Sequence, residues 1–519
     1  MTPYLAFFAY LFAASAPLGY RLLIKHFTPG FDEYEAIFVY LNDAALIFFL
    51  VFYLCFFWLE RPAVLFMRQL SERFRLGSAK ARERRLCLAA GAKQHPVPAE
   101  QNRGTFSVIS KTEAYIAIAF LAFCAISTAF ADYKLLALYD FLRLALLMLA
   151  AFALGKLVGI GVVKFKNIFI ILSSLAVIES LIGFLQFIAQ QSLGLKVLGE
   201  SVLGLSVAGS AKVVVDGTPL LRAYGTFPHP NVLAAFLLLG LASLYYLWLQ
   251  APRLTSQNWG GRTLRNTFLG IGIFAICTGL ALSFSRAGWI LASAISVLTI
   301  GYYLYQKSYR ARAATLLVVV VASCMFLLAT LSNLVFPRAA INISEPAVSY
   351  RLAYNEIGLN LIKNHPLGVG LGNQVVYSVD NEVYQKFGMN QVWQWQPIHN
   401  IYLLIASEAG VLGLIAFILF VASVVFKISN FPAYAKASVG RQFSIFKLIR
   451  RAHHPELSEG QTPNSEFFIS TIMLSALLGF GLVDHFLWTL EPGRLMLWLT
   501  IGLVMGADFA DNKADKQSL

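Results

Sequence analysis

Charged residues are scarce in this sequence. Asp, Glu, Lys and Arg make up 13% of the 519 residues, whereas soluble domains contain roughly 25%. Hydrophobic residues reach 58%, and the mean hydropathy is +0.66. These values exclude a soluble enzyme of this length. Since a membrane-spanning helix needs about 20 apolar residues, the chain has apolar sequence for about ten helices or more, and we expect a polytopic membrane protein.

Cysteine is also rare. The five cysteines all fall in apolar runs or in basic loops, at Cys55, Cys87, Cys124, Cys277 and Cys324. None is placed to form a disulfide bond on the oxidising side of a membrane, and no Cys-x-x-Cys pair is present for a metal or redox centre. The first apolar run also lacks a basic segment and a small-residue cleavage site, so we expect a retained span rather than a signal peptide.

Long apolar runs are what the sequence has in abundance. They predict an all-α protein with about twelve membrane-spanning helices. The predicted spans cover residues 3–22, 36–59, 112–131, 135–155, 167–188, 231–250, 267–284, 287–306, 314–335, 400–426, 467–489 and 495–510.

The loops between these runs differ in charge, and this difference predicts the orientation of the chain. Loop 61–103 holds ten basic and three acidic residues, and loop 427–466 holds six and three. Loops 251–266 and 307–313 hold three basic residues each and no acidic residue. Cytoplasmic loops are enriched in Lys and Arg, and all four lie on one side of a twelve-span chain. Both termini are therefore expected in the cytoplasm, and the net charge of +14 needs no nucleic-acid partner.

Two long segments fall on the opposite side, residues 189–230 and 336–399. The second has four basic and four acidic residues, and it predicts a helix of its own. This helix would begin at Ser344-Glu345-Pro346, where Ser can cap and Pro is tolerated, and end at Asn364-His365-Pro366. The chain is thereby divided into 1–335 (spans one to nine, with the basic cytoplasmic loop 60–111 and the periplasmic loop 189–230), 336–399 (a large helical periplasmic loop) and 400–519 (spans ten to twelve and a cytoplasmic tail).

Arginines at the non-cytoplasmic ends of spans are unusual, because charge near the hydrocarbon is costly and the orientation rule disfavours them there. Arg222 precedes the sixth span, Arg286 lies in a short turn between two spans, and Arg351 lies on the predicted loop helix. Guanidinium stays protonated and binds phosphate bidentately, so three convergent arginines would hold a diphosphate without a metal. The alternative is snorkelling to headgroups or pairing with an acid.

His399, at the boundary between the large loop and the tenth span, is a candidate general base because imidazole titrates near neutral pH. The alternative is a structural histidine. Glu408 lies two and a half turns further along the same helix, too far to pair with it directly. Trp393 and Trp395, just before His399, suit either an interfacial aromatic belt or stacking on sugar rings.

Three glycines alternate along the chain after the loop helix, at Gly368, Gly370 and Gly372. They allow the backbone to approach a ligand or another backbone closely. The segment lacks the G-x-G-x-x-G spacing and a Walker lysine, so it is not a nucleotide site. A tight turn and a contact with glycan or phosphate both remain open.

Charged residues inside the spans have structural interpretations. Asp140 and Arg143 are three residues apart and are expected to neutralise each other. Glu179 and Gln186 lie seven apart and would share one inward face of the fifth span. The pair Asp484-His485, near the outer boundary of the eleventh span, is either a supporting group for a site or a packing pair.

The acidic cluster on the outer side is Asp32-Glu33-Tyr34-Glu35 in the first outer loop. Its carboxylates would suit a divalent cation, and a solvated loop explains them equally well. We expect no metal and no other cofactor, with Asp32, Glu33 and Glu35 as the place where a metal would bind if one is used.

These motifs, in this order, resemble the O-antigen ligase and polymerase superfamily of bacterial envelope glycosyltransferases. The matching stretches span about 222–414 and are Arg222-x-x-Gly225-x-Phe227-x-His229-Pro230-Asn231, Ser285-Arg286-x-Gly288, Arg351 with His365-Pro366-x-Gly368-x-Gly370, and His399-Asn400 followed by Glu408-x-Gly410. The resemblance implies a GT-C-like fold in the bacterial inner membrane with a periplasmic active site. It also implies transfer of a glycan from undecaprenyl diphosphate to an acceptor.

The resemblance further implies roles for single residues. Arg222 and Arg351, with Arg286 in support, would bind the diphosphate, and His399 would accept the proton of the acceptor hydroxyl. The reaction would be a single displacement that inverts the anomeric carbon. The expected substrate-binding set is completed by His229, Asn231, Asn400, Tyr350 and Trp395.

A ligase that attaches O-antigen to a sugar of lipid A–core is the first interpretation, because no large outer domain follows the spans to hold a protein acceptor. A polymerase and a protein O-oligosaccharyltransferase are the alternatives within the superfamily. A transporter or flippase is the alternative outside it, although little twofold hydropathy symmetry is present. The expected partners are the lipid-linked glycan donor, the lipid A–core acceptor and membrane lipids, with no nucleic acid.

Overall fold

The computed structural model is mostly helical and describes the greater part of the chain. The described residues are 2–26, 36–56, 111–250, 259–339, 346–426 and 465–517. The basic loops 61–103 and 427–464 and the acidic cluster Asp32-Glu33-Tyr34-Glu35 therefore lie outside the described residues.

Eight of the described helices are long and apolar enough to cross a membrane. They are α3 (Lys111–Phe130), α4 (Lys134–Gly159), α5 (Phe165–Ala189), α6 (Pro230–Leu249), α7 (Trp259–Leu282), α8 (Arg286–Tyr305), α9 (Arg310–Ala339) and α13 (Ile401–Phe426). Shorter apolar helices lie within α1 (Thr2–Ala14), at Leu41–Phe56 and in α16 (Ser465–Phe480), and α18 (Glu491–Gln517) ends the chain. Each lies in a region where a span is predicted. The total of twelve spans stays a prediction.

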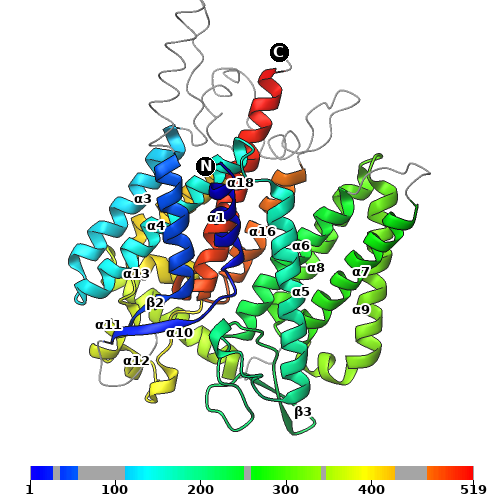
Figure 1. Ribbon diagram of the computed structural model, residues 1–519. Helices are drawn as coiled ribbons and strands as arrows, with labels where there is room; N and C mark the ends of the chain where they lie inside the picture. The colour runs from blue at the N-terminus through cyan, green and yellow to red at the C-terminus, as the bar shows by residue number, and fades with distance from the viewer. Residues whose placement is uncertain are drawn as a thin grey trace, which may run out of the picture.

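The helices form two groups around a buried centre (Figure 1). Helix α6 is buried along nearly its whole length and packs against α5, α7, α8 and α16. On the other side α4 runs along α18, and α3 along α13. These neighbours cover α6 almost completely, whereas the equally apolar α9 leaves most of its surface uncovered.

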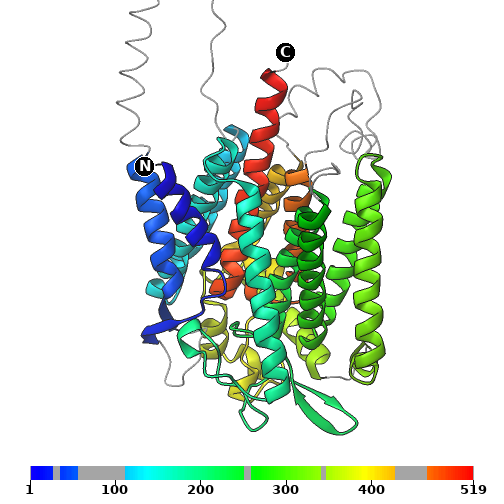
Figure 2. The ribbon, with the colours of Figure 1, turned by 45° about the vertical axis from the view of Figure 1, so that its right-hand side comes forward.

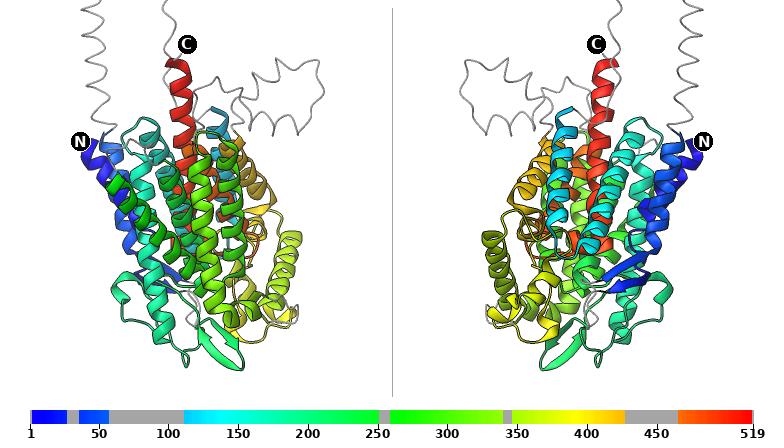
Figure 3. Two further views of the ribbon diagram at one scale, coloured as in Figure 1. Left: turned by 90° about the vertical axis from the view of Figure 1, so that its right-hand side faces the viewer. Right: turned by 90° about the vertical axis from the view of Figure 1, so that its left-hand side faces the viewer.

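The two termini lie at one end of the bundle (Figure 1). The opposite end, which we call the loop end, carries the two hairpins described below and the short helices α10 (Pro346–Asn364), α11 (Gln374–Asp380) and α12 (Val383–Lys386). Both views in Figure 3 show these helices beside the bundle at this end. The predicted loop helix is confirmed as α10, with Tyr354, Ile357 and Leu361 buried against the bundle.

The expectation of an all-α chain is wrong at two places, where antiparallel hairpins occur. Strand β1 (Arg21–His26) pairs with β2 (Ala36–Tyr40), and β3 (Lys212–Val215) pairs with β4 (Thr218–Leu221). The first hairpin includes the last residues of the predicted span 3–22 and the first residues of the predicted span 36–59. A short apolar run does not distinguish a strand from a helix. Figure 2 shows β3 and β4 projecting beyond the helices.

The β3–β4 turn consists of Asp216 and Gly217, both with positive φ (49° and 78°). This dipeptide is a favoured two-residue hairpin connection, because its twist matches that of the strands. An Asp-Gly pair between apolar residues was therefore a usable signal for this hairpin. Strand β4 ends at Leu221, so the hairpin fixes the position of the next residue, Arg222.

Helix α13 is broken at Gly410 (φ 78°, ψ 168°). The glycine segment 366–372 lies in the break, where Val369 donates a backbone hydrogen bond to Ser407 (2.9 Å) and Val411 donates one to Pro366 (3.1 Å). The backbone groups that the break leaves without helical partners are satisfied in this way. The close backbone approach is thus to another backbone, as expected for a tight structural turn.

Gly368 tests this interpretation. It has φ of +87°, and a Cβ there would overlap the carbonyl oxygen of Glu408. Replacing Gly368 by Ala is expected to destabilise the fold by more than the roughly 1–2 kcal/mol of a left-handed residue alone. Gly388→Ala is the matched control, because Gly388 also has positive φ (+78°) but open space around it. The thermal midpoint in detergent should fall more for Gly368→Ala, and equal midpoints would contradict the overlap.

Candidate active site

Arg222 lies at the loop end, just after β4, and is 7% exposed. Its Nε donates a hydrogen bond to the carbonyl oxygen of Ser283 (2.7 Å), and its Nη2 donates one to Oδ1 of Asn231 (3.2 Å). These bonds leave part of the guanidinium group available to a further acceptor, since the group has five N–H donors. The alternative, a direct ion pair of Arg222 with an acid, is not seen among the described residues.

Two polar side chains of α5 hold the segment that follows Arg222. Glu179 accepts hydrogen bonds from the backbone N–H (2.8 Å) and the hydroxyl (2.9 Å) of Thr226. The side-chain oxygen of Gln186 accepts from the N–H groups of Tyr224 (3.1 Å) and Gly225 (2.8 Å). The prediction that Glu179 and Gln186 share an inward face is confirmed, and their role is to fix the backbone of the Arg222 motif.

A chain of hydrogen bonds connects Arg222 to Asp484. Asn231, in the first turn of α6, accepts from Arg222 and donates through Nδ2 to Oδ2 of Asp484 (2.7 Å). Asp484 and His485 are both 5% exposed and precede α17 (Phe486–Thr489). Burial by itself would raise the pKa of Asp484, but the facing imidazoles of His485, His399 and His229, together with Arg351, hold this pKa below its ordinary value. Asp484 is therefore an ionised carboxylate at the centre of the site.

His399 lies between α10 and this pair. Its ring stacks on Tyr354 (centroids 4.8 Å apart, planes at 9°) and meets the ring of His485 edge-on at 4.7 Å. Its Nδ1 lies 2.8 Å from the carbonyl oxygen of Pro397. Because a carbonyl only accepts, Nδ1 carries the proton and Nε2 presents a lone pair. Burial lowers the pKa of His399, while Asp484 acts in the opposite direction, so the imidazole is neutral and basic at neutral pH.

His229 has the opposite arrangement of protons. It caps the N-terminus of α6, and its Nδ1 accepts from the backbone N–H of Asn231 (3.2 Å). The proton of the neutral ring is therefore on Nε2, which makes this nitrogen a donor. Burial and the positive charge of Arg222 lower the pKa of His229 to about 3. The site thus contains one imidazole that donates and one that accepts.

Positive charge is concentrated around Arg222. Burial lowers the pKa of Arg222 to about 9, and the guanidinium groups of Arg338 and Arg351 lower this pKa as well. Arg286 begins α8, and its Nε donates to the carbonyl oxygen of Arg338 (2.6 Å). Crowded guanidinium groups of this kind attract a multivalent anion, which relieves their mutual repulsion.

Sequence reasoning missed three members of this site as site residues. Arg338, which follows Pro337 in the last turn of α9, is one of the four basic residues of segment 336–399. Tyr354 lies at an apolar position of the predicted loop helix, α10. Asp484 was left between a supporting and a packing role, and it lies about 250 residues from its partner Asn231, a proximity that spacing does not reveal.

Three other predicted substrate-binding residues form hydrogen bonds within the protein in this structure. Asn400 caps α13, where its Oδ1 accepts from the backbone of Tyr402 (2.9 Å), and its Nδ2 donates to the carbonyl oxygen of Leu482 (3.2 Å). The indole N–H of Trp395 donates to the carbonyl oxygen of Met389 (3.1 Å). Tyr350 accepts a hydrogen bond from Gln394 (3.1 Å) and lies edge-on to the exposed ring of Trp393. A contact of these residues with substrate stays a prediction.

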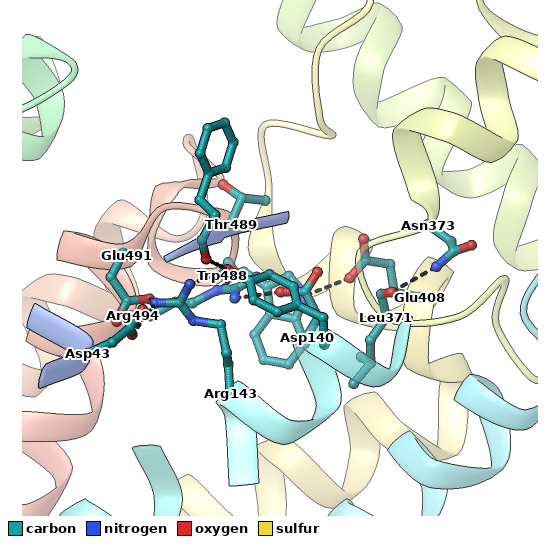
Figure 4. A network of polar contacts seen from close by, with 12 residues as sticks. Asp43, Asp140, Arg143, Leu371, Asn373, Glu408, Trp488, Thr489, Glu491 and Arg494 are labelled. Atoms are coloured by element: carbon teal, nitrogen blue, oxygen red, sulfur yellow. Dashed lines mark hydrogen bonds and ion pairs between the residues drawn. The ribbon is translucent and has the colours of Figure 1, made fainter. Parts of the chain in front are cut away.

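A second polar network lies beside this site (Figure 4). The expected neutralisation of Asp140 by Arg143 is wrong. Asp140 pairs with Arg494 (2.6 Å), while Arg143 pairs with Asp43 (2.8 Å) and Glu491 (2.6 Å). The partners come from other elements: α18 supplies Arg494 for Asp140 and Glu491 for Arg143, and the helix Leu41–Phe56 supplies Asp43 for Arg143.

Glu408 also belongs to this second network. Its Oε2 accepts from the indole N–H of Trp488 (2.8 Å), so it does not bind an arginine directly. Among the described residues, no group of three or more His, Cys, Asp or Glu side chains is arranged to hold a metal ion.

The comparison with protein families gives one match. Residues 271–418 match a family described as O-antigen ligase. This segment carries Arg286, Arg338, Arg351 and His399, and its match confirms the resemblance to the O-antigen ligase family stated from the motifs. The match covers less than half of the chain, and four of the eight helices that are long and apolar enough to cross a membrane, α7, α8, α9 and α13, lie wholly or partly within it. A comparison with curated proteins gave no match.

Proposed function

We propose that the protein transfers O-antigen polysaccharide from undecaprenyl diphosphate to a sugar hydroxyl of lipid A–core, at the periplasmic face of the bacterial inner membrane. The loop end would then be periplasmic and both termini cytoplasmic. The proposal rests on two features of the same site. One is the arginine group, by which we mean Arg222, Arg286, Arg338 and Arg351. The other is His399, whose Nε2 presents a lone pair.

The arginine group suits the diphosphate of the donor. Arg338 and Arg351 both act electrostatically on Arg222, and His229 adds a neutral N–H donor. As the bond from the sugar to the diphosphate breaks, its electron pair moves to the phosphate oxygen. Fixed cationic donors stabilise this developing charge without reorganising. No metal is needed for this step in the proposal.

His399 supplies the base for the incoming hydroxyl. Its Nε2 accepts the hydroxyl proton while the oxygen forms its bond to the anomeric carbon, and the diphosphate leaves from the opposite face. The carbon is therefore inverted in one displacement. Asp484, next to His485 and acting electrostatically on His399, stabilises the imidazolium that results.

Purified protein supplied with lipid-linked glycan and lipid A–core provides the test. We expect glycan-extended lipid A–core to form, and to form equally in excess EDTA. Absence of transfer would contradict the proposed function, and loss of transfer in EDTA would contradict only its independence of metal. A deletion strain separates the alternatives, because loss of a ligase leaves polymer on the carrier lipid, whereas loss of a polymerase leaves single repeats on the core.

The pH dependence of kcat/KM follows from the state of His399. Protonation of Nε2 abolishes the base, and the pKa of His399 lies below the ordinary value of about 6.5. Activity should therefore persist to lower pH than an exposed histidine allows, with the acid limb centred below pH 6.5.

The Asp484→Asn variant provides a second test of this prediction. The carboxylate of Asp484 raises the pKa of His399, so removing its charge should move the acid limb to still lower pH while kcat falls. An acid limb that does not move, or that moves to higher pH, would contradict the assignment of this limb to His399.

A further inference from the structure

The second polar network surrounds a cavity, which we call the side cavity, that the proposed mechanism does not use. The cavity is partly open and lies between the β1–β2 hairpin, α4, α11 and the start of α18. Arg222, Arg286, Arg338 and Arg351 are not among its lining residues.

The side cavity shares a wall with His399. Pro397 lines the cavity, and its carbonyl oxygen accepts the Nδ1 proton of His399. Thr489 also lines it and bonds through Oγ1 to Nδ1 of His485 (2.6 Å). Each of the two histidines therefore contacts a residue that lines the side cavity.

The side cavity is lined by charged groups of both signs. Its wall contains three guanidinium groups, from Arg21, Arg143 and Arg494, and three carboxyl groups, from Asp140, Glu408 and Glu491. Arg143 is ion-paired with Glu491 and Arg494 with Asp140, so these arginines are already matched by carboxyl groups rather than left for an anion such as a diphosphate, and the wall presents charged donors and acceptors side by side. Such groups form strong hydrogen bonds with hydroxyl groups, which donate and accept at the same atom.

Aromatic rings complete this wall. Phe38, Tyr40 and Trp488 line the side cavity, and flat rings of this kind pack against the apolar face of a sugar. Stability alone does not account for the arrangement, because apolar residues of equal volume stabilise a core as well as buried ion pairs do, or better. Gly372 leaves room for one of the carboxylates of the wall, since a Cβ at this position would overlap Asp140.

We propose that the side cavity binds the terminal sugar of the acceptor, a proposal that rests on the function proposed above. In a single displacement the incoming hydroxyl and the leaving diphosphate occupy opposite faces of the anomeric carbon. The arginine group defines the leaving side, so the acceptor must approach from the side of His399, and the side cavity adjoins His399 through Pro397. The ligand is thus a neutral, polyhydroxylated ring rather than a phosphate.

Leu136→Phe tests the proposal by filling the side cavity. Leu136 is buried in the first turn of α4 and lines the cavity. Leu138→Phe is the matched control on the same helix, since Leu138 is 45% exposed and is not among the lining residues. Val375→Met, on the facing α11, fills the cavity from the other wall if Leu136→Phe fails to fold.

The measurements are KM for lipid A–core and KM for the lipid-linked donor, together with calorimetric binding of the free core oligosaccharide. We expect the filling variants to raise KM for the acceptor by at least about tenfold and to weaken oligosaccharide binding equally. KM for the donor should change less than about twofold, and Leu138→Phe should resemble the wild type.

The outcomes separate this inference from the proposed function. An unchanged acceptor KM in a folded filling variant, or a raised donor KM, would overturn the inference while transfer itself stands. If the wild type shows no transfer, the proposed function fails, and calorimetry still decides the cavity. Binding that is lost only in the filling variants supports a carbohydrate site, and equal or absent binding in all proteins overturns it.

Discussion

Replacing His399 by alanine is expected to lower kcat for glycan transfer by about 10²–10⁴-fold, the usual contribution of a positioned general base. Its Nδ1 proton is directed to Pro397, so Nε2 is the nitrogen that meets the acceptor hydroxyl. KM for the donor should change little, because the arginine group remains. Purified variants assayed with saturating donor and lipid A–core provide the measurement.

His365→Ala is the matched control for His399→Ala. His365 lies after α10 at the same end of the protein, but its Nε2 bonds to the hydroxyl of Tyr377 (2.8 Å). It should therefore keep most of the wild-type kcat. Near-wild-type turnover in folded His399→Ala would reject the general base, and an equal loss in both variants would indicate a general effect on the loop end.

Arg222→Ala is expected to lower kcat by about 10²–10³-fold, the typical cost of removing one donor that stabilises developing negative charge. Arg222→Lys should recover only part of this loss, because an ammonium group lacks the planar fork that matches a phosphate. Release of undecaprenyl diphosphate in a single turnover would measure the step directly, since it reports the broken sugar–phosphate bond.

Stability must be measured beside this variant. Arg222 donates to Ser283 and Asn231, and its removal leaves both acceptors buried without that partner. Arg310→Ala is the control for a lost arginine, because Arg310 is exposed at the start of α9. If folded Arg222→Ala releases the diphosphate at the wild-type rate, the arginine group does not stabilise the leaving group.

Much of the architecture follows from the order of residues. Apolar runs predicted the helices at nearly their observed positions, because burying or spanning twenty apolar residues requires a helix. The helix α10 followed from its apolar period and its boundary residues. The family followed from short motifs around Arg222, Arg286 and His399, whose spacing along the chain is local.

The sequence by itself determined most of the helical segments, though not the two hairpins, and it determined which residues have unusual chemistry for their place. Only the tertiary structure decided which side chains interact. Asn231 bonds to Asp484, and Arg143 pairs with Glu491 rather than with Asp140. Arg338 belongs to the arginine group. Pairing across hundreds of residues depends on how helices pack and rotate, and side-chain period along one helix carries no information about its neighbour. The proton positions on His229 and His399 depend likewise on contacts that form only in the folded chain.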